Sequence, residues 1–226
     1  MKRNSIIPIA VILLMFGMVC NAEEQVKVTG NTIKGDTEKK ITYLDGNVKI
    51  IQGSNIILTE KAKIDLDNKL LYLENQVVFN GPDVTIQALT LDYNLKKKNG
   101  TFKTDVVLKR KEKKENGKNQ KDPFTLIADE MYFDSESKNF VATKGKIEHK
   151  DFNGSADRID YDDQQQLLVL TGNAYLKRPE GEEVWGDSTK INLKDKSFTV
   201  EKNVTVNFDV DDEKTPAKDS AKETSK

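Results

Sequence analysis

The feature that most constrains the fold of this chain is an internal repeat. Val48, Val77 and Val106 occupy matching places in successive repeats and are spaced by 29 residues. Each repeat contains a segment of alternating apolar and polar residues, a polar cluster, a second alternating segment, and a step rich in glycine or asparagine. A chain built this way is expected to form one supersecondary unit per repeat and to bury a shared core by stacking the units.

The pattern within each repeat predicts a β-hairpin. Alternation such as Lys63-Ile64-Asp65-Leu66-Asp67 places apolar side chains on one face of a strand and polar ones on the other. The polar clusters that follow are typical of hairpin turns. The remaining steps are expected to bend the strands, because glycine and asparagine tolerate left-handed backbone. These steps are Gly46-Asn47, Gly145-Lys146 and Gly172-Asn173, with Asn75-Gln76 and Asn203 in equivalent places. The fold class predicted is therefore all-β, with antiparallel hairpins.

The two ends of the chain differ from the repeats. Lys2 and Arg3 precede an apolar run over residues 6–19, and Cys20-Asn21-Ala22 offers small residues for cleavage before Glu23. We interpret residues 1–22 as a signal peptide, residues 23–208 as the folded domain and residues 209–226 as a disordered charged tail. Two alternatives stay open, namely that the segment is kept as a membrane anchor or that Cys20 carries a lipid.

The sequence contains no recognisable catalytic or cofactor motif. His149 is the only histidine, and no phosphate-binding loop or dinucleotide fingerprint occurs. We therefore predict no catalytic residue, no metal and no cofactor, and assign His149 a structural or rim position. The 36 basic residues nearly balance the 37 acidic ones, which disfavours nucleic acid as a partner.

An insertion interrupts the repeats between Val106 and Ile147. It includes residues 109–122, "KRKEKKENGKNQKD", with seven basic and three acidic side chains. The simplest interpretation is an extended, solvated hairpin. The alternative is a basic arm that lies near phosphates or an anionic membrane surface.

Alternation alone defines the side chains expected to face inward. Such a face can be a closed core, or it can line a groove that shelters acyl chains, and both roles stay open for each residue. The candidate groove residues are Val48, Ile50, Ile64, Leu66, Val77, Phe79, Val84, Ile86, Leu91, Tyr93, Met131, Phe133, Ile159, Tyr161, Leu168, Leu170, Ile191 and Leu193.

Four stretches of the chain resemble a known family. They are "YLDGNVKIIQGSNIILTEKAKI", "GSADRIDYDDQQQ", "LVLTGNAYLKR" and "VWGDSTKINL". Together they make the chain similar to the periplasmic lipopolysaccharide-transport bridge proteins of the LptA/OstA-like family, over about residues 26–206. The long middle insertion departs from the short members of that family.

This resemblance implies an open antiparallel β-jellyroll whose interior accepts the lipid A acyl chains of lipopolysaccharide. It also implies head-to-tail homo-oligomers and joints with LptC-like inner-membrane and LptD-like outer-membrane jellyrolls in the periplasm. The terminal segments near Val26–Val28 and Val204–Phe208 are the candidate joining edges. The alternatives are an LptC-like membrane-anchored component, a structural β-repeat protein with parallel coils, and a secreted hydrolase. The short polar turns disfavour the parallel coils, and the lone His149 disfavours the hydrolase.

Overall fold

The architecture is entirely β in the part of the chain that the structure describes. The computed structural model describes residues 25–115 and 118–208. The predicted signal peptide and charged tail lie outside these residues. The strands are β1 (Val26–Thr29), β2 (Thr32–Asp36), β3 (Ile41–Gln52), β4 (Asn55–Asp65), β5 (Leu70–Asn80), β6 (Val84–Asn94), β7 (Asn99–Arg110), β8 (Lys113–Glu115), β9 (Lys118–Lys121), β10 (Phe124–Asp134), β11 (Phe140–His149), β12 (Phe152–Asp162), β13 (Leu167–Lys177), β14 (Glu183–Asn192), β15 (Ser197–Glu201) and β16 (Thr205–Asn207).

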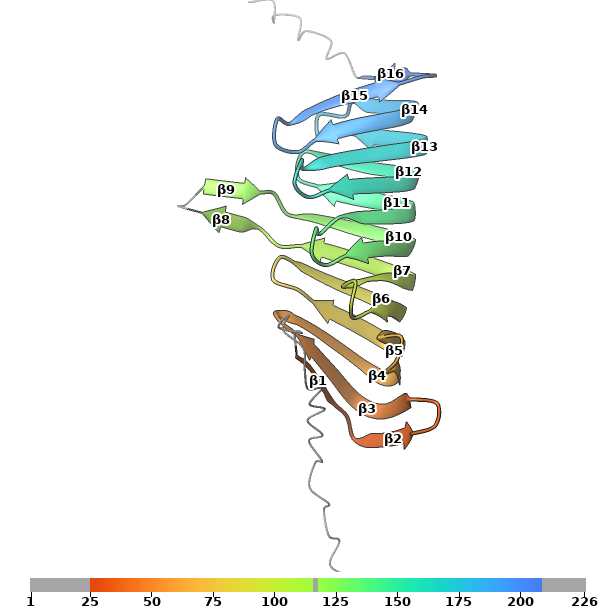
Figure 1. Cartoon of the computed structure of the whole chain (residues 1–226). Helices are drawn as coiled ribbons and strands as arrows, with labels where there is room; N and C mark the ends of the chain where they lie inside the picture. The colour runs from red at the N-terminus through yellow and green to blue at the C-terminus, as the bar shows by residue number, and fades with distance from the viewer. Residues whose placement is uncertain (1–24, 116–117, 209–226) are drawn as a thin grey trace, which may run out of the picture.

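All strands except β8 and β9 belong to one antiparallel sheet. From β3 to β14 each strand of this sheet pairs with the strands before and after it in sequence, except that β7 pairs with β10 across the β8–β9 ribbon, and the sheet does not close on itself. The strands therefore stack as a ladder along one axis, as Figure 1 shows. The hairpin prediction is confirmed, and the alternative of parallel coils is wrong.

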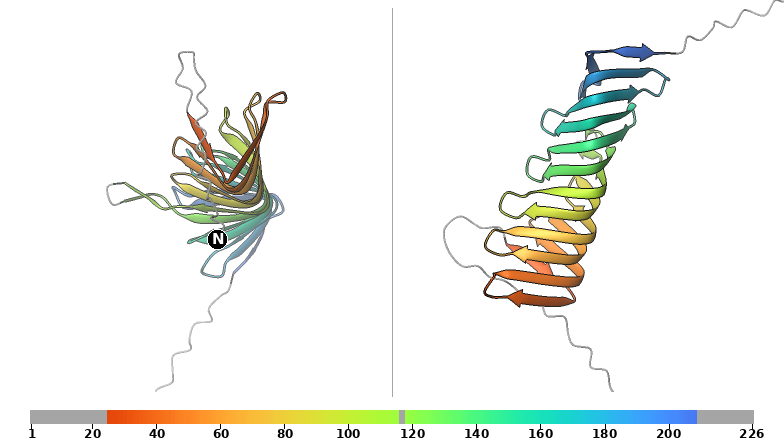
Figure 2. Two further views of the ribbon diagram at one scale, coloured as in Figure 1. Left: turned by 90° about the horizontal axis from the view of Figure 1, so that it is seen from below. Right: turned by 90° about the vertical axis from the view of Figure 1, so that its right-hand side faces the viewer.

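The long strands are bent in the middle, so that the sheet folds into two walls. The pairing register shifts near the centre of most strand pairs, for example between Asp45 and Val48 of β3 and between Thr171 and Ala174 of β13. At the ends of the stack, β1 and β2 both pair with β3, and β15 and β16 both pair with β14. β1 and β2 together thus form one bent strand with an interrupted middle, and β15 and β16 form another (Figure 2).

We name the walls by their turns. The first wall ends in the turns at 37–40, 66–69, 95–98, 135–139, 163–166 and 193–196. The second wall ends in the turns at 53–54, 81–83, 150–151 and 178–182, and it also carries the β8–β9 ribbon. The bends form one long edge of the molecule. The line along which turns of the first wall face those of the second is called the seam.

Left-handed backbone produces the bends, as the sequence predicts for most of them. Gly46 and Asn47 have φ of 76° and 50°, and Gly172 and Asn173 have 76° and 49°. Asn75, Gln76 and Asn203 are also left-handed. The prediction is wrong for Gly145-Lys146, because the left-handed residue of that strand is Lys144. Two left-handed residues in β7, Thr104 and Asp105, were not predicted.

The turns of the first wall share one hydrogen-bonding device. The side chain of Asp65 accepts the N–H of Asn68 at 2.9 Å, and Asn94, Asp162 and Asn192 accept the N–H three residues on in the same way. Such local carboxylate and amide acceptors stabilise tight turns. They explain the recurrence of Asp and Asn at the ends of the repeats without a catalytic role.

The two walls bury a single apolar core between them. Phe79 of the second wall packs against Tyr93, Phe102 and Phe133 of the first wall, with ring centroids 5.7–6.4 Å apart. All four rings are at most 2% exposed. The described chain contains no helix that is long and apolar enough to cross a membrane.

Candidate functional site

The residues predicted to line a groove lie on the inner faces of the two walls. Seventeen of the eighteen are buried, with exposed fractions of 8% or less, and Leu66 is half-buried against the same core. They are drawn from strands β3 to β14 and from the turns at 66–69 and 193–196. The structure therefore brings them together as one continuous apolar interior along the stack. In this conformation their side chains pack against one another.

Aromatic clusters extend along this interior. The first contains Phe79, Tyr93, Phe102 and Phe133, described above. The second contains Phe124 of the second wall, with Phe140 and Tyr161 of the first wall, at centroid distances of 5.1–6.1 Å. Of these rings, Phe102, Phe124 and Phe140 were not among the predicted groove residues. They alternate with polar neighbours, as in Thr101-Phe102-Lys103, in the same way as the predicted groove residues do. The sequence pattern could therefore have identified them.

The seam is closed by side chains, in contrast to the bend edge, where the backbone is continuous. The Gln52 side chain of the second wall donates to the backbone oxygen of Leu95 in the first wall at 2.8 Å. The Tyr93 hydroxyl donates to the Gln52 side chain at 3.4 Å. Asn55 reaches Ser135 at 3.5 Å, and Lys138 forms an ion pair with Asp83 across the same line. Side-chain contacts of this kind can break without loss of any strand pairing.

The insertion contributes to the seam as well as to the surface. Its β8–β9 ribbon projects away from the stack (Figure 1), in keeping with the solvated hairpin that the sequence predicts. Its flanks differ from that prediction. Arg110 is the last residue of β7, is 5% exposed, and lies 3.0 Å from Oδ1 of Asp163 in the first wall. Lys121 also forms an ion pair with Asp163. Sequence reasoning missed these residues, because a charged run gives no sign of which member is buried.

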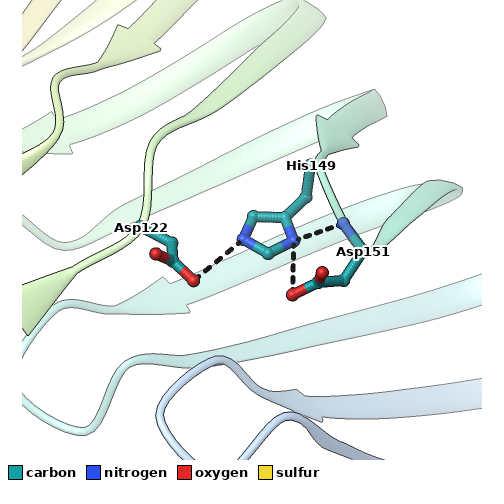
Figure 3. Close-up of side chains that lie close together, drawn as sticks. All are labelled: Asp122, His149 and Asp151. Atoms are coloured by element: carbon teal, nitrogen blue, oxygen red, sulfur yellow. Dashed lines mark hydrogen bonds and ion pairs between the residues drawn. The ribbon is translucent and has the colours of Figure 1, made fainter. Parts of the chain in front are cut away.

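His149 lies between two carboxylates at the base of the insertion (Figure 3). Its Nε2 is 3.8 Å from Oδ2 of Asp122, and its Nδ1 is 3.9 Å from Oδ2 of Asp151. The side chain is 2% exposed, and Nε2 has no hydrogen-bond partner. Burial lowers the pKa of His149, while the two nearby carboxylates act in the opposite direction.

This cluster is better suited to structure than to chemistry. Nδ1 accepts the backbone N–H of Asp151 at 3.2 Å, so the neutral ring carries its proton on Nε2, which leaves no free lone pair for a metal. Lys150 already occupies the Asp122 carboxylate at 3.0 Å. The geometry therefore favours the structural role that the sequence predicts for His149.

A cleft of about 430 Å³ lies at the C-terminal end of the seam. Its apolar lining comes from both walls and includes Phe152, Leu176, Ile191 and Leu193, which also belong to the buried core. Arg178, Lys196, Asp151 and Glu180 line it as well. The cleft is therefore a place where the apolar interior approaches the surface beside charged side chains of both signs.

The fold and its apolar interior define a class of protein. The family model described as "LptA/(LptD N-terminal domain) LPS transport protein" matches residues 27–197, which is well over half of the chain. The chain therefore belongs to this family of lipopolysaccharide-transport proteins. This result confirms the resemblance identified from the sequence, and the fold is the antiparallel jellyroll that the resemblance implies.

Among solved structures, the chain is similar to LptH from Pseudomonas aeruginosa. That protein is described as the LptA homologous periplasmic component of the conserved lipopolysaccharide transport device. The alignment has 14% sequence identity and a TM-score of 0.32, and it covers 66% of this chain and 84% of LptH. No curated protein sequence matches the chain.

Proposed function

We propose that the protein carries lipopolysaccharide across the periplasm, with the lipid A acyl chains held between the two walls. The observation that supports this most strongly is an apolar interior that runs through successive bent strands and is closed along one side only by side chains. Parting the walls at the seam would turn the packed interior into a groove. The eighteen predicted groove residues are the proposed lipid contacts.

Transfer of an acyl chain from water into this apolar interior is expected to be favourable. Each methylene moved from water to an apolar environment gains about 0.8 kcal/mol, so one acyl chain gains on the order of 10 kcal/mol before costs. Separating the walls exposes apolar side chains, but the acyl chain covers them again. The net cost is therefore concentrated in the polar contacts of the seam. The proposed role is that of a carrier and not of an enzyme.

Photocrosslinking tests the proposed contacts. A photoreactive residue at Phe133, which is 1% exposed, should capture lipopolysaccharide in cells. Its neighbour Tyr132 lies on the same strand, faces outward and is 42% exposed, so the same label there should capture little. Leu73 and Tyr72 form a second matched pair, at 1% and 37% exposed. Equal capture at inward and outward positions would contradict lipid binding between the walls.

We further propose that the two ends of the stack join other jellyrolls. In the described chain, β1 and β2 pair only with β3, and β15 and β16 pair only with β14. Their outer edges can therefore accept a strand from a partner. The proposed partners are further copies of the chain, head to tail, and the LptC-like and LptD-like jellyrolls of the inner and outer membranes. A contact between unlike ends extends into a filament.

The soluble bridge and the LptC-like anchored component differ at the N-terminus. Signal cleavage before Glu23 supports the bridge, and retention of residues 1–22 supports the anchored component. Intact-mass measurement of the protein purified from cells distinguishes them. A mass that includes residues 1–22 would overturn the bridge while leaving the proposed lipid contacts untouched.

A further inference from the structure

One seam contact is built differently from the others. The Asp163 carboxylate follows β12 in the first wall and is bound by three groups. The Tyr161 hydroxyl donates to its Oδ1 at 3.2 Å, Nη2 of Arg110 lies 3.0 Å from the same oxygen, and the Lys121 ammonium pairs with Oδ2. We name these four residues the Asp163 clasp.

The clasp holds more positive charge than its one carboxylate balances. Two cations, Arg110 and Lys121, face a single anion, and Arg110 and Asp163 are only 5% and 8% exposed. Nη1 of Arg110 donates to the Tyr161 hydroxyl, but Nη2, although 3.0 Å from Oδ1 of Asp163, makes no hydrogen bond. A buried guanidinium with an unsatisfied donor is costly. The site is therefore shaped for an anion with more charge and more acceptor oxygens than a carboxylate.

A phosphate monoester has these properties. It carries a charge of about −1.5 to −2 at neutral pH and presents three acceptor oxygens. The planar fork of arginine matches such oxygens in pairs. Tyr161 adds a donor that persists, because burial raises the pKa of its hydroxyl.

The surroundings of the clasp indicate what the phosphate is attached to. The Arg110 guanidinium carbon lies 5.5 Å from the ring centroid of Phe124 and 5.2 Å from that of Tyr161. Both rings belong to the second aromatic cluster of the interior. An anion in the clasp would thus lie at the seam, directly beside the apolar core. This arrangement suits an amphiphile with its phosphate at the seam and its acyl chains between the walls.

We propose that Arg110, Lys121 and Tyr161 bind a phosphate of the glycolipid headgroup, and that Asp163 fills this site when no cargo is present. The inference rests on the proposed function. Phosphate and the Asp163 carboxylate compete for the same cations. Binding of the cargo therefore separates Asp163, and the first-wall turn at 163–166 that carries it, from Arg110 and Lys121. The seam opens there when the headgroup binds.

The test compares two forms of one lipid. The full mature chain is titrated in a fluorescence binding assay with lipid A that carries two phosphates and is added without vesicles. A second titration uses the same lipid after both phosphates have been removed. The wild type should prefer the phosphorylated form by about tenfold or more, the gain expected for hydrogen bonds to a charged group. Equal binding of the two forms would overturn the phosphate site but leave the carrier function standing. No binding of either form would overturn the carrier function itself.

Substitutions assign the preference to the clasp. Arg110→Gln should reduce the preference for the phosphorylated lipid to about twofold. Lys121→Gln should also reduce this preference. Because the Lys121 side chain is more exposed than that of Arg110, the fold should tolerate its replacement. Asp163→Asn should tighten binding of the phosphorylated lipid, because the competing charge is gone. The matched control is Lys138→Gln, which removes the seam ion pair with Asp83 and should leave the preference unchanged.

Two results would overturn the assignment. One is a preference that Lys121→Gln and Asp163→Asn both leave unchanged. The other is displacement of the phosphorylated lipid by a few millimolar inorganic phosphate, which would identify free phosphate as the ligand instead of a headgroup. Failure of inorganic phosphate to compete supports the headgroup.

Discussion

Individual residues decide where each strand bends and how closely the walls pack. At Gly172-Asn173 the bend follows the expected chemistry, since both residues are left-handed. Gly145 has another function. A Cβ there would lie 2.7 Å from Cδ1 of Ile159, so the glycine makes space for the neighbouring strand while Lys144 takes the left-handed backbone. A sequence motif with glycine therefore predicts a bend region but not which property of glycine is used.

The close packing at Gly145 gives a stability prediction. Gly145→Ala should lower the free energy of unfolding by about 1–3 kcal/mol, because the methyl overlaps Ile159. In Ile159→Val the colliding Cδ1 is absent, so the double variant should be more stable than the sum of the two single changes predicts. Urea denaturation of the four proteins measures this coupling. Strictly additive losses would contradict the packing role of Gly145.

The buried imidazole of His149 gives a pH prediction. Burial lowers the pKa of His149 below its usual 6.5 in the folded protein. The unfolded chain therefore binds this proton more readily, so the stability that the neutral ring contributes is full above about pH 6.5 and is lost as the pH falls through the lower, folded pKa. Asp122, Asp151, Lys150 and Lys196 are the charged groups that face the ring.

Melting temperatures measured from pH 7.5 to 5.0 test this sign. Relative to wild type, His149→Gln should lose less stability over that range, since His149 is the only histidine of the chain. Parallel pH profiles for the two proteins would contradict the burial of a neutral ring.

At the scale of elements, the repeating unit is a bent hairpin with one face turned inward. Alternation in the sequence predicted this inward face well, because shifting the alignment of one repeat on another by two residues keeps the same side chains on the inner face. For the same reason, alternation does not reveal an alignment of two repeats that is wrong by two residues. By sequence alone Ile64-Asp65-Leu66-Asp67 aligns with Leu91-Asp92-Tyr93-Asn94, which matches Asp65 to Asp92. In the structure, however, Asp65 accepts the turn N–H as Asn94 does, two residues further along. Contacts across the seam, such as Arg110 with Asp163, join residues of distant repeats, and no local pattern encodes them.

Locking the seam should block the carrier. The side chains of Asn55 and Ser135 meet across it at 3.5 Å, and the mature chain expected after cleavage contains no cysteine. In the double variant Asn55→Cys/Ser135→Cys, oxidation should therefore join the walls and reduce lipopolysaccharide binding at least about tenfold if the walls must part. A reductant should restore binding. The two single variants control for the substitutions, and undiminished binding by the oxidised protein would contradict opening at this point.

At the scale of the whole molecule, the stack is open at both ends, and the C-terminal end is apolar. Val204, Val206 and Phe208 are 48%, 44% and 68% exposed on or beside β16. Exposed apolar residues on an unpaired edge are typical of a surface that a partner covers.

Charge placed on this edge should prevent end-to-end association. Val206→Glu should shift concentrated protein from oligomers to monomers, with little change in melting temperature because the residue is exposed. Light scattering coupled to size exclusion measures the shift. The control is Leu89→Glu, an exposed apolar position (44%) on the interior strand β6. An equal effect of both substitutions would argue against a specific joint at the C-terminal edge.

The central claim is that the two walls separate to hold acyl chains. Spin labels at positions 55 and 135 report the width of the seam, and labels at positions 72 and 132, both on the outer face of the first wall, report a distance within one wall. Pulsed electron resonance with and without lipopolysaccharide should show the seam distance lengthening while the distance within the wall stays constant. Saturating lipid that leaves the seam distance unchanged would contradict the account.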